Sequence, residues 1–156
     1  MATIAKAKLN AENAAILPLS ASPENFSMLI QELQGRQYGW GNLGFYNDCS
    51  AEMKAIFTMM GYFMPRNTKN QGLAGKVVDI SKLSPKDRSL YLMKNGDPLL
   101  TLIHLPGHIL LYVGTYKNQD GSQFALSYQQ MWGLSPKDRS SRSVIGKSVF
   151  LPLLLS

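Results

Sequence analysis

The chain has 156 residues, of which 45% are hydrophobic and 17% charged, and its formal net charge is +6. This composition is typical of one soluble globular domain with a sizeable core, and it excludes a disordered chain. A single cysteine excludes an internal disulfide, and no CxxC pair indicates zinc. The positive charge suits a polyanionic partner, but the basic residues are scattered, so a solvated basic surface explains them equally well.

Residues 1–22 are predicted to be an irregular lead-in that could lie along the surface of a domain over 23–156. Their apolar run AAILPL is interrupted by Pro18, whereas a signal peptide needs roughly 7 to 15 apolar residues. The final LPLLLS is far shorter than the about 20 residues that cross a bilayer. We therefore expect neither a signal peptide nor a membrane span in this sequence.

The first helix is predicted at SPENFSMLIQELQG. Ser22 is a suitable N-cap, Pro23 fits the first helical position, and Gly35 can end the helix. The apolar stripe is formed by Phe26, Leu29, Ile30 and Leu33. Next, RQYGWGNLGFYN (36–47) predicts either a loop whose backbone approaches a neighbour closely or an aromatic-packed turn.

The only cysteine, Cys49, lies in the next predicted helix, DCSAEMKAIFTMMG. The helical spacing is carried by Met53, Ile56, Phe57 and Met60, and Gly61 is a suitable terminator. Asp48 can cap this helix, which places Cys49 in the first turn and on the buried stripe. The positive end of the helix dipole stabilises a thiolate there, although a buried cysteine is otherwise just a small apolar side chain.

The second half of the chain is predicted to be mainly strands. A polar loop (62–75), a short strand or turn and a brief helix capped by Ser84 come first. Strands are then expected at 98–105, 108–116, 124–132 and 143–155, with a hairpin turn at Asp120-Gly121. The heptapeptide LSPKDRS occurs at 83–89 and 134–140, either as two similar capped turns that arose by chance or as a small duplication. Helices followed by an antiparallel sheet make an α+β fold.

A thiol becomes a catalytic nucleophile only with a base nearby. His108 opens the strand HILLYVG, from which it can project towards the Cys helix, whereas His104 lies inside LLTLIHL and is expected to be structural, in or near the core. The residues alone support a Cys–His pair and a buried, inert cysteine equally.

The base would in turn need an oxygen acceptor for its ring N–H. Gln129 and Gln130 lie on the return strand of the hairpin that His108 begins, and adjacent strands are about 4.8 Å apart. Asp97 and Asp120 are alternatives, although both lie in predicted turns. No metal-binding cluster or phosphate-binding loop is apparent, so no cofactor is expected.

Five motifs, in this order, resemble the NlpC/P60 cysteine peptidases: YGWG, DCS, MPRNT-x-x-Q, PGHILLYVG and MWG. DCS alone would be weak evidence, but the motifs occur together in the family's order, and the resemblance runs from about Asn25 to Pro152. The resemblance is to the bacterial branch that usually carries SH3-type domains. It implies a papain-like α+β domain, with the nucleophile helix packed on an antiparallel sheet. The implied activity is cleavage of peptidoglycan stem peptides, typically between γ-D-glutamate and L-lysine or a diaminopimelate residue.

By position, the resemblance implies that Cys49 is the nucleophile, His108 the general base and Gln129 the third member of the triad. Tyr38 matches a tyrosine whose hydroxyl lies beside the nucleophile, where it could donate to the oxyanion together with the Cys49 backbone N–H.

Substrate contacts are implied in the same way. Asp48 and Ser50 match positions linked to binding the free amine of the stem peptide's L-alanine, although Asp48 could be only the helix cap. Arg66 could pair with a substrate carboxylate or order its own loop. Trp40 and Trp132 could wall the groove or belong to the core.

Three departures from the family pattern stand out. Gln129 occupies a place where relatives usually have histidine, and as a neutral amide it stabilises imidazolium less than a charged group would. Asn42 stands where a second glycine of the family's GWGG turn is usual, and Asn tolerates positive φ better than most residues. Asn47 replaces a common arginine. Residues 1–22 are also too short for an SH3-type domain.

The expected function is therefore that of a D,L-endopeptidase of peptidoglycan. The alternatives are an N-acetylmuramoyl-L-alanine amidase and a non-catalytic peptidoglycan-binding module, which the Gln129 substitution favours. Expected partners are stem peptides or muropeptides, without nucleic acid, and an SH3-type domain or other protein absent from this sequence. The expected location is the periplasm or cell wall, with a cytoplasmic recycling enzyme or a secreted effector as alternatives.

Overall fold

The computed structural model describes residues 4–136 and 138–153. Its helices are η1 (Ala11–Asn13), α1 (Pro23–Leu33), η2 (Trp40–Phe45), α2 (Cys49–Met59), α3 (Thr68–Gln71) and α4 (Pro85–Asn95). Its strands are β1 (Leu102–Leu105), β2 (His108–Lys117), β3 (Gln123–Leu134) and β4 (Ser143–Leu153). The order, helices first and strands afterwards, confirms the predicted α+β class.

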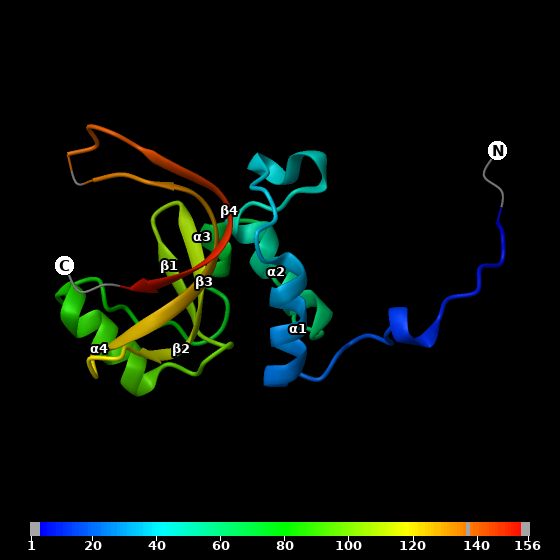
Figure 1. Ribbon diagram of the computed structural model, residues 1–156, viewed down its shortest axis with the longest axis horizontal. Coiled ribbons are helices and arrows are strands. Elements are labelled where there is room, and N and C mark those ends of the chain that lie inside the picture. The colour runs from blue at the N-terminus through cyan, green and yellow to red at the C-terminus, as the bar shows by residue number, and fades with distance from the viewer. Residues whose placement is uncertain (1–3, 137, 154–156) are drawn as a thin grey trace.

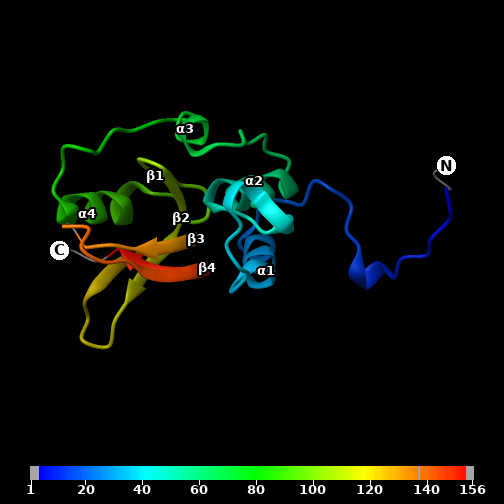
Figure 2. The same cartoon turned by 90° about the horizontal axis from the view of Figure 1, so that it is seen from above.

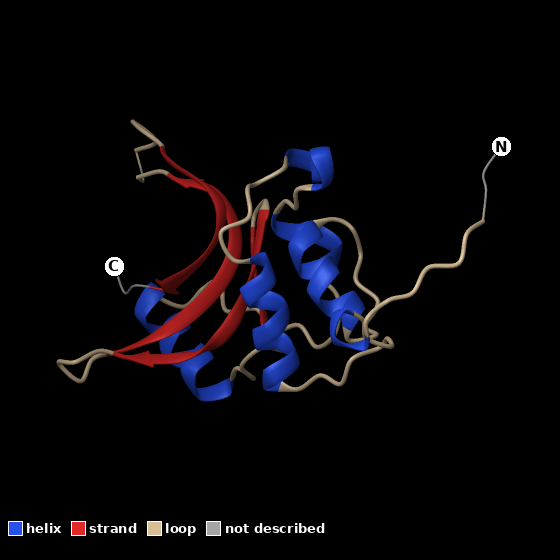
Figure 3. Cartoon of the chain, turned by 45° about the vertical axis from the view of Figure 1, so that its right-hand side comes forward, coloured by secondary structure: helices blue, strands red, loops and turns tan. Residues whose placement is uncertain are grey.

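The strands form one antiparallel sheet in the order β1-β2-β3-β4, so each strand pairs with its neighbours in sequence. One row across the sheet runs from Leu102 through Leu111 and Tyr128 to Phe150. Figure 1 shows α1 and α2 on one side of this sheet and α4 on the other, and Figure 3 shows the curved strands beside α1.

The alternation of side chains along β2 builds two apolar layers, because successive residues point to opposite faces of a strand. Ile109 and Leu111 pack with Tyr128 against α1 and α2, where Phe26, Ile30, Met53 and Ile56 are almost completely buried. Tyr112 points the other way and packs with Leu92 of α4. The sheet is thus covered on both faces, and α2 is held against its centre.

Both long N-terminal helices begin and end as the sequence predicts. The Ser22 hydroxyl caps α1 by accepting from the Asn25 N–H, and Pro23 is its first residue. Asp48 caps α2 by accepting from the Ala51 N–H at 2.8 Å. Gly61 follows the C-cap of α2 at φ 80°, a conformation that favours glycine.

The loop after α1 folds back on itself. A Cβ added to Gly39 would lie 2.5 Å from the Tyr46 carbonyl oxygen, so the close approach is to the loop's own backbone. Asn42 adopts φ 69°, as its side chain predicts. The result is a tight turn that ends directly before Asp48.

Two predictions about other elements were wrong in detail. Residues 62–75 are not all loop, because Asn67 caps the single turn α3 by accepting from the Asn70 N–H. The strand predicted from residue 98 begins only at Leu102, as β1. The short strand or turn predicted before Ser84 is a turn, in which the Leu83 N–H donates to the Ile80 carbonyl. In the second LSPKDRS copy, Leu134 ends β3 and the described residues after it lie in the β3–β4 connection. Residues 154 and 155 of the last predicted strand lie outside the described residues.

The core position predicted for His104 was also wrong. This residue is exposed on β1, the edge strand, and its ring lies against Gly72, where an added Cβ would come within 2.6 Å of it. Strand alternation puts His104 on the face of Leu102, which packs against the core beneath α2, and opposite Ile103, which packs with Leu92 of α4. His104 nevertheless stays exposed at the end of this short edge strand.

The N-terminal segment touches the domain only near its end. Figures 1 and 2 show it extending away from the helices instead of lying along the surface, and Ile4 and Ile16 are almost wholly exposed. Contact begins at Pro18, which lies against Gly61, and the Leu19 N–H donates to the Met59 carbonyl at 2.9 Å.

Candidate active site

Cys49 is the first residue of α2, and only 5% of its surface is exposed. The Ile109 backbone N–H faces the Cys49 thiol and lowers its pKa. Ile109 follows His108, so the start of β2 lies beside the thiol. The structure thus brings the N-terminus of α2 and the beginning of β2 together, as the fold required.

The Tyr38 side chain is a second group beside the thiol, and it lowers the pKa of Cys49. The segment before it is bound to β4: the Tyr38 N–H donates to the Gly146 carbonyl at 2.8 Å, and the Ser148 N–H to the Arg36 carbonyl at 3.0 Å. Burial, the nearby thiol and Asp48 raise the pKa of Tyr38. Its hydroxyl therefore stays protonated and available as a donor.

His108 and Gln129 meet across β2 and β3. His108 Nε2 lies 2.8 Å from Gln129 Oε1. Gln129 Nε2 donates in turn to the Ser127 hydroxyl at 2.9 Å, and that hydroxyl donates to the Leu151 carbonyl. The other predicted acceptor, Gln130, points elsewhere, since its Nε2 donates to the Arg36 carbonyl and to the Ser148 hydroxyl.

Asp48, Ser50 and Arg66 form one polar cluster next to Cys49. Arg66 donates from Nη2 to Asp48 Oδ2 at 2.7 Å and from Nη1 to Asp48 Oδ1 at 3.1 Å and to the Ser50 hydroxyl at 2.9 Å. Ser50 donates to Asp48 Oδ1. Asp48 therefore serves as a helix cap and as the partner of Arg66, which also orders the loop before α3.

The two tryptophans pack around Tyr38. The ring centroids of Tyr38 and Trp40 are 5.0 Å apart, and Trp132 lies 5.9 Å from Tyr38 and 5.8 Å from Trp40. Trp40 is 61% exposed, so this aromatic group lies at the surface beside the thiol and outside the core.

The environment of Cys49 favours the neutral thiol. Burial raises its pKa, and the Asp48 carboxylate raises it further. Hydrogen bonds from Ile109, Tyr38 and the Ser50 backbone lower the pKa, but the net direction is upward. The helix position predicted a stabilised thiolate, whereas in this structure burial outweighs that effect. A base would be needed to remove the proton.

The sequence model of the NlpC/P60 family matches residues 35–140, which include every predicted site residue from Tyr38 to Trp132. The chain belongs to the NlpC/P60 family. Over 81 residues it is 37% identical to the gamma-D-glutamyl-L-lysine dipeptidyl-peptidase of Bacillus subtilis (strain 168), covering 51% of this chain and 25% of that protein.

A solved structure described as a novel NlpC/P60 endopeptidase from Photobacterium damselae subsp. piscicida has the same fold, with a TM-score of 0.79. The two chains are 26% identical, and the match covers 92% of this chain and 35% of the other. This NlpC/P60 chain thus spans about a quarter to a third of the length of the two relatives.

Sequence reasoning missed two buried polar residues of this NlpC/P60 domain. Ser127 is two residues before Gln129, a spacing that puts both on one face of a strand and could have revealed their contact. Glu52, completely buried, accepts from the Tyr128 hydroxyl and from Asn47 Nδ2. It is one turn after Cys49, but no local pattern predicts a carboxylate there.

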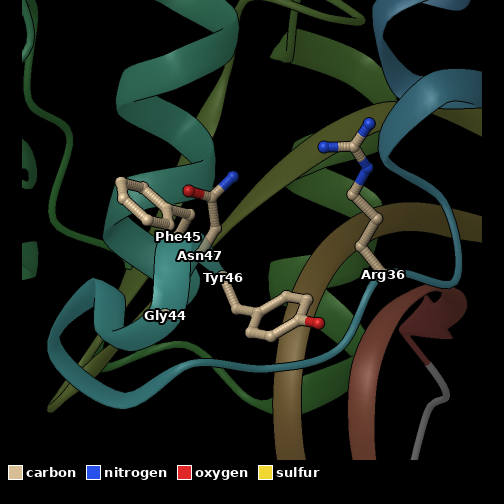
Figure 4. Close-up of a pocket in the computed structure, with 5 residues that line it drawn as sticks. All are labelled: Arg36, Gly44, Phe45, Tyr46 and Asn47. Atoms are coloured by element: carbon tan, nitrogen blue, oxygen red, sulfur yellow. The ribbon is translucent and has the colours of Figure 1, made fainter.

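Two hollows border the site without containing Cys49 or His108. An open groove of about 530 Å³ lies between α1 and α2 and reaches Arg66. A smaller one of about 290 Å³ lies behind the η2 loop, where Figure 4 shows Tyr46 and Asn47 on one side and Arg36 on the other. Among the residues that the structure describes, no three His, Cys, Asp or Glu side chains cluster in a way that would hold a metal ion.

Proposed function

We propose that this NlpC/P60 domain is a cysteine peptidase that hydrolyses peptidoglycan stem peptides at the bond between γ-D-glutamate and the following L-diamino acid. The observation that carries the proposal is the His108–Gln129 hydrogen bond at the start of β2, where the next residue, Ile109, lies beside the Cys49 thiol. It supports a catalytic over a purely binding role, because Gln129 contacts the histidine in the way a triad's third residue must. The name of the Bacillus subtilis relative supports the choice of bond.

In the proposed mechanism, His108 Nδ1 accepts the Cys49 proton while the sulfur attacks the γ-D-glutamyl carbonyl carbon. The Tyr38 hydroxyl and the Cys49 backbone N–H donate to the resulting oxyanion. The C–N bond then breaks as His108 protonates the leaving amine, which leaves a thioester on Cys49. Water, deprotonated by His108, attacks the thioester, and the acid and the free thiol are released.

Substrate binding is proposed at the polar cluster and the aromatic group. Asp48 and Ser50 would bind the free amine of L-alanine, and Arg66 would keep the Asp48 carboxylate oriented towards it. Trp40 and Trp132 would wall the groove. We propose that the domain acts in the periplasm or cell wall, where its positive charge suits an anionic polymer.

The test is a digest of purified muropeptides by the parent protein and by Cys49→Ala, analysed by mass spectrometry. Products with a dipeptide left on the sugar, formed only by the parent protein, are the expected result. Release of intact tripeptide or tetrapeptide would move the cut to the amidase bond. Binding of muropeptides without cleavage would overturn the proposal in favour of a binding module.

The role of Gln129 can be tested in the same muropeptide digest. Gln129→Ala removes the acceptor from His108 Nε2, and a positioned base contributes about 10²–10⁴-fold to such reactions. We expect cleavage to fall by at least about 10-fold in this variant, as part of that contribution. The matched variant Gln119→Ala, on an exposed turn, should cleave like the parent protein.

A further inference from the structure

A glutamine as third member of the triad creates an orientation problem that a carboxylate does not have. Its side chain ends in one acceptor and one donor, and only the acceptor can hold the histidine in the useful form. If the amide turned over, its N–H₂ group would face His108 Nε2, and the ring proton would move to Nδ1. The nitrogen that must accept the thiol proton would then be occupied. Something must therefore fix the Gln129 amide.

The described residues contain a chain of hydrogen bonds that does so. The Ser127 hydroxyl donates its only proton to the Leu151 carbonyl of β4 at 2.9 Å. Towards Gln129 it can therefore only accept, and it takes a hydrogen bond from Nε2 at 2.9 Å. This leaves Oε1 for His108 at 2.8 Å.

Burial leaves no alternative to this arrangement of donors and acceptors. Ser127 has no exposed surface and Gln129 only 3%, so water cannot replace either partner at low cost. The Leu151 carbonyl is fixed by its place in the β3–β4 ladder, where Leu151 pairs with Ser127. The main-chain carbonyl of Leu151 in β4 thereby determines which ring nitrogen of His108 carries the proton.

We propose that Ser127 is the positioning residue of the triad: through the Gln129 amide it holds His108 as the Nε2–H tautomer, with Nδ1 free to accept the Cys49 proton. This inference rests on the proposed function for its effect on cleavage. Its effect on the tautomer is independent of any activity.

The first experiment measures the tautomer by the ¹⁵N chemical shifts of the His108 ring in the full chain, with His104 as the only other histidine. The parent protein should show protonated Nε2. Ser127→Ala should shift the ring towards protonated Nδ1 or a mixture. Ser148→Ala is the matched control, because that serine is also buried, also donates to a carbonyl and also accepts from a glutamine, Gln130. It should leave the tautomer unchanged.

The second experiment separates orientation from packing. A glutamate at position 129 has two equivalent oxygens and needs no orientation. Ser127→Ala should therefore lower kcat by about 10-fold, part of the contribution of a positioned base, in the parent protein. In the Gln129→Glu background it should lower kcat by no more than about two-fold, the scatter of independent sites.

Equal losses in both backgrounds, or an unchanged tautomer in Ser127→Ala, would overturn the inference. If no variant cleaves muropeptides, the proposed function fails while the tautomer measurement still decides the role of Ser127.

Discussion

The Cys49 thiol is surrounded by groups that act on its pKa in opposite directions. Burial and Asp48 raise it, and the hydroxyl of Tyr38 is the one side-chain donor that lowers it among the causes resolved for the described residues. Because the chain has a single cysteine, its reactivity can be measured without interference from other thiols.

Replacing Tyr38 with phenylalanine should raise the pKa of Cys49 further. In the parent protein, we expect the rate of thiol alkylation by iodoacetamide to rise with pH around a midpoint above the ordinary cysteine pKa of about 8.5. In Tyr38→Phe the midpoint should lie at a still higher pH. Tyr46→Phe, a partly exposed control, should match the parent protein. A midpoint that fell or did not move in Tyr38→Phe would show that the hydroxyl does not stabilise the thiolate.

The Asp48 carboxylate should make the domain's stability depend on pH. Burial alone would raise its pKa, but hydrogen bonds from Arg66, Ala51 and Ser50 bring it below the usual value. The stabilisation is therefore present above the unfolded-state pKa of about 3.9 and is lost as pH falls through the lower native value. Arg66 is 42% exposed, so Asp48→Asn, which can still cap the helix, should lower the free energy of unfolding by only about 1 kcal/mol at pH 7.

Urea unfolding at pH 7 and pH 3 measures this difference. The gap between the parent protein and Asp48→Asn should shrink at pH 3. A gap that stayed the same at both values would mean that the charge of Asp48 contributes nothing.

Whole elements were predictable where the signals were local. Ser22-Pro23 and Asp48 predict where α1 and α2 begin, and the spacing of the apolar residues predicts that the segments after them are helical. LSPKDRS shows the limit of such signals. The first copy begins α4, whereas in the second copy Leu134 ends β3 and the described residues after it lie in the β3–β4 connection. The apolar stripe of α4 follows only the first copy, so the surrounding sequence decides.

The two copies provide a matched pair of substitutions. Ser84 caps α4 by accepting from the Asp87 N–H, so Ser84→Ala should lower the free energy of unfolding by about 1 kcal/mol. Ser135→Ala removes no cap and should change it by less than about 0.5 kcal/mol. Thermal or urea unfolding of both variants checks this, and equal losses would contradict the assignment of Ser84 as the cap.

The candidate site was predictable to the extent that each residue depends on its own element. Cys49 at a helix start and His108 at a strand start could be placed from sequence. The choice between Gln129 and Gln130 needed the register of β2 against β3, and the pairing of Arg66 with Asp48 joins residues 18 apart through a loop. The role of Ser127 depends on its hydrogen bond to the Leu151 carbonyl of β4, a contact between strands that the local sequence does not predict.

On the scale of the whole molecule, the domain is three layers with an N-terminal segment attached at one point. Helices α1 and α2, the sheet and α4 are packed on one another, and residues 4–16 extend beyond them (Figure 1). No helix in the described part of the chain is long and apolar enough to cross a bilayer.

Shortening the chain should therefore affect stability in two distinct steps. Removal of residues 1–16 should change the free energy of unfolding by less than about 0.5 kcal/mol, because the described part of this segment is exposed. Removal of residues 1–22 also deletes the Ser22 cap and the Leu19 contact, and should cost about 1–2 kcal/mol. Urea unfolding distinguishes the two, and a large loss from the shorter deletion would contradict the view that this segment is dispensable for folding.

The segment at 72–83 has a consequence for how the site is encoded. It lacks regular structure, and it separates Tyr38, Cys49 and Arg66 from His108 and Gln129. The chain is thus two complementary lengths, one holding the thiol and one holding the proposed base, and neither contains the proposed Cys–His pair. Cutting the bond between Lys76 and Val77, both exposed, should yield a Cys49 fragment that alkylates like an ordinary thiol when alone and regains the parent protein's alkylation profile when the two fragments are mixed. Continuity of the polypeptide would then matter for assembly of the site and not for its chemistry.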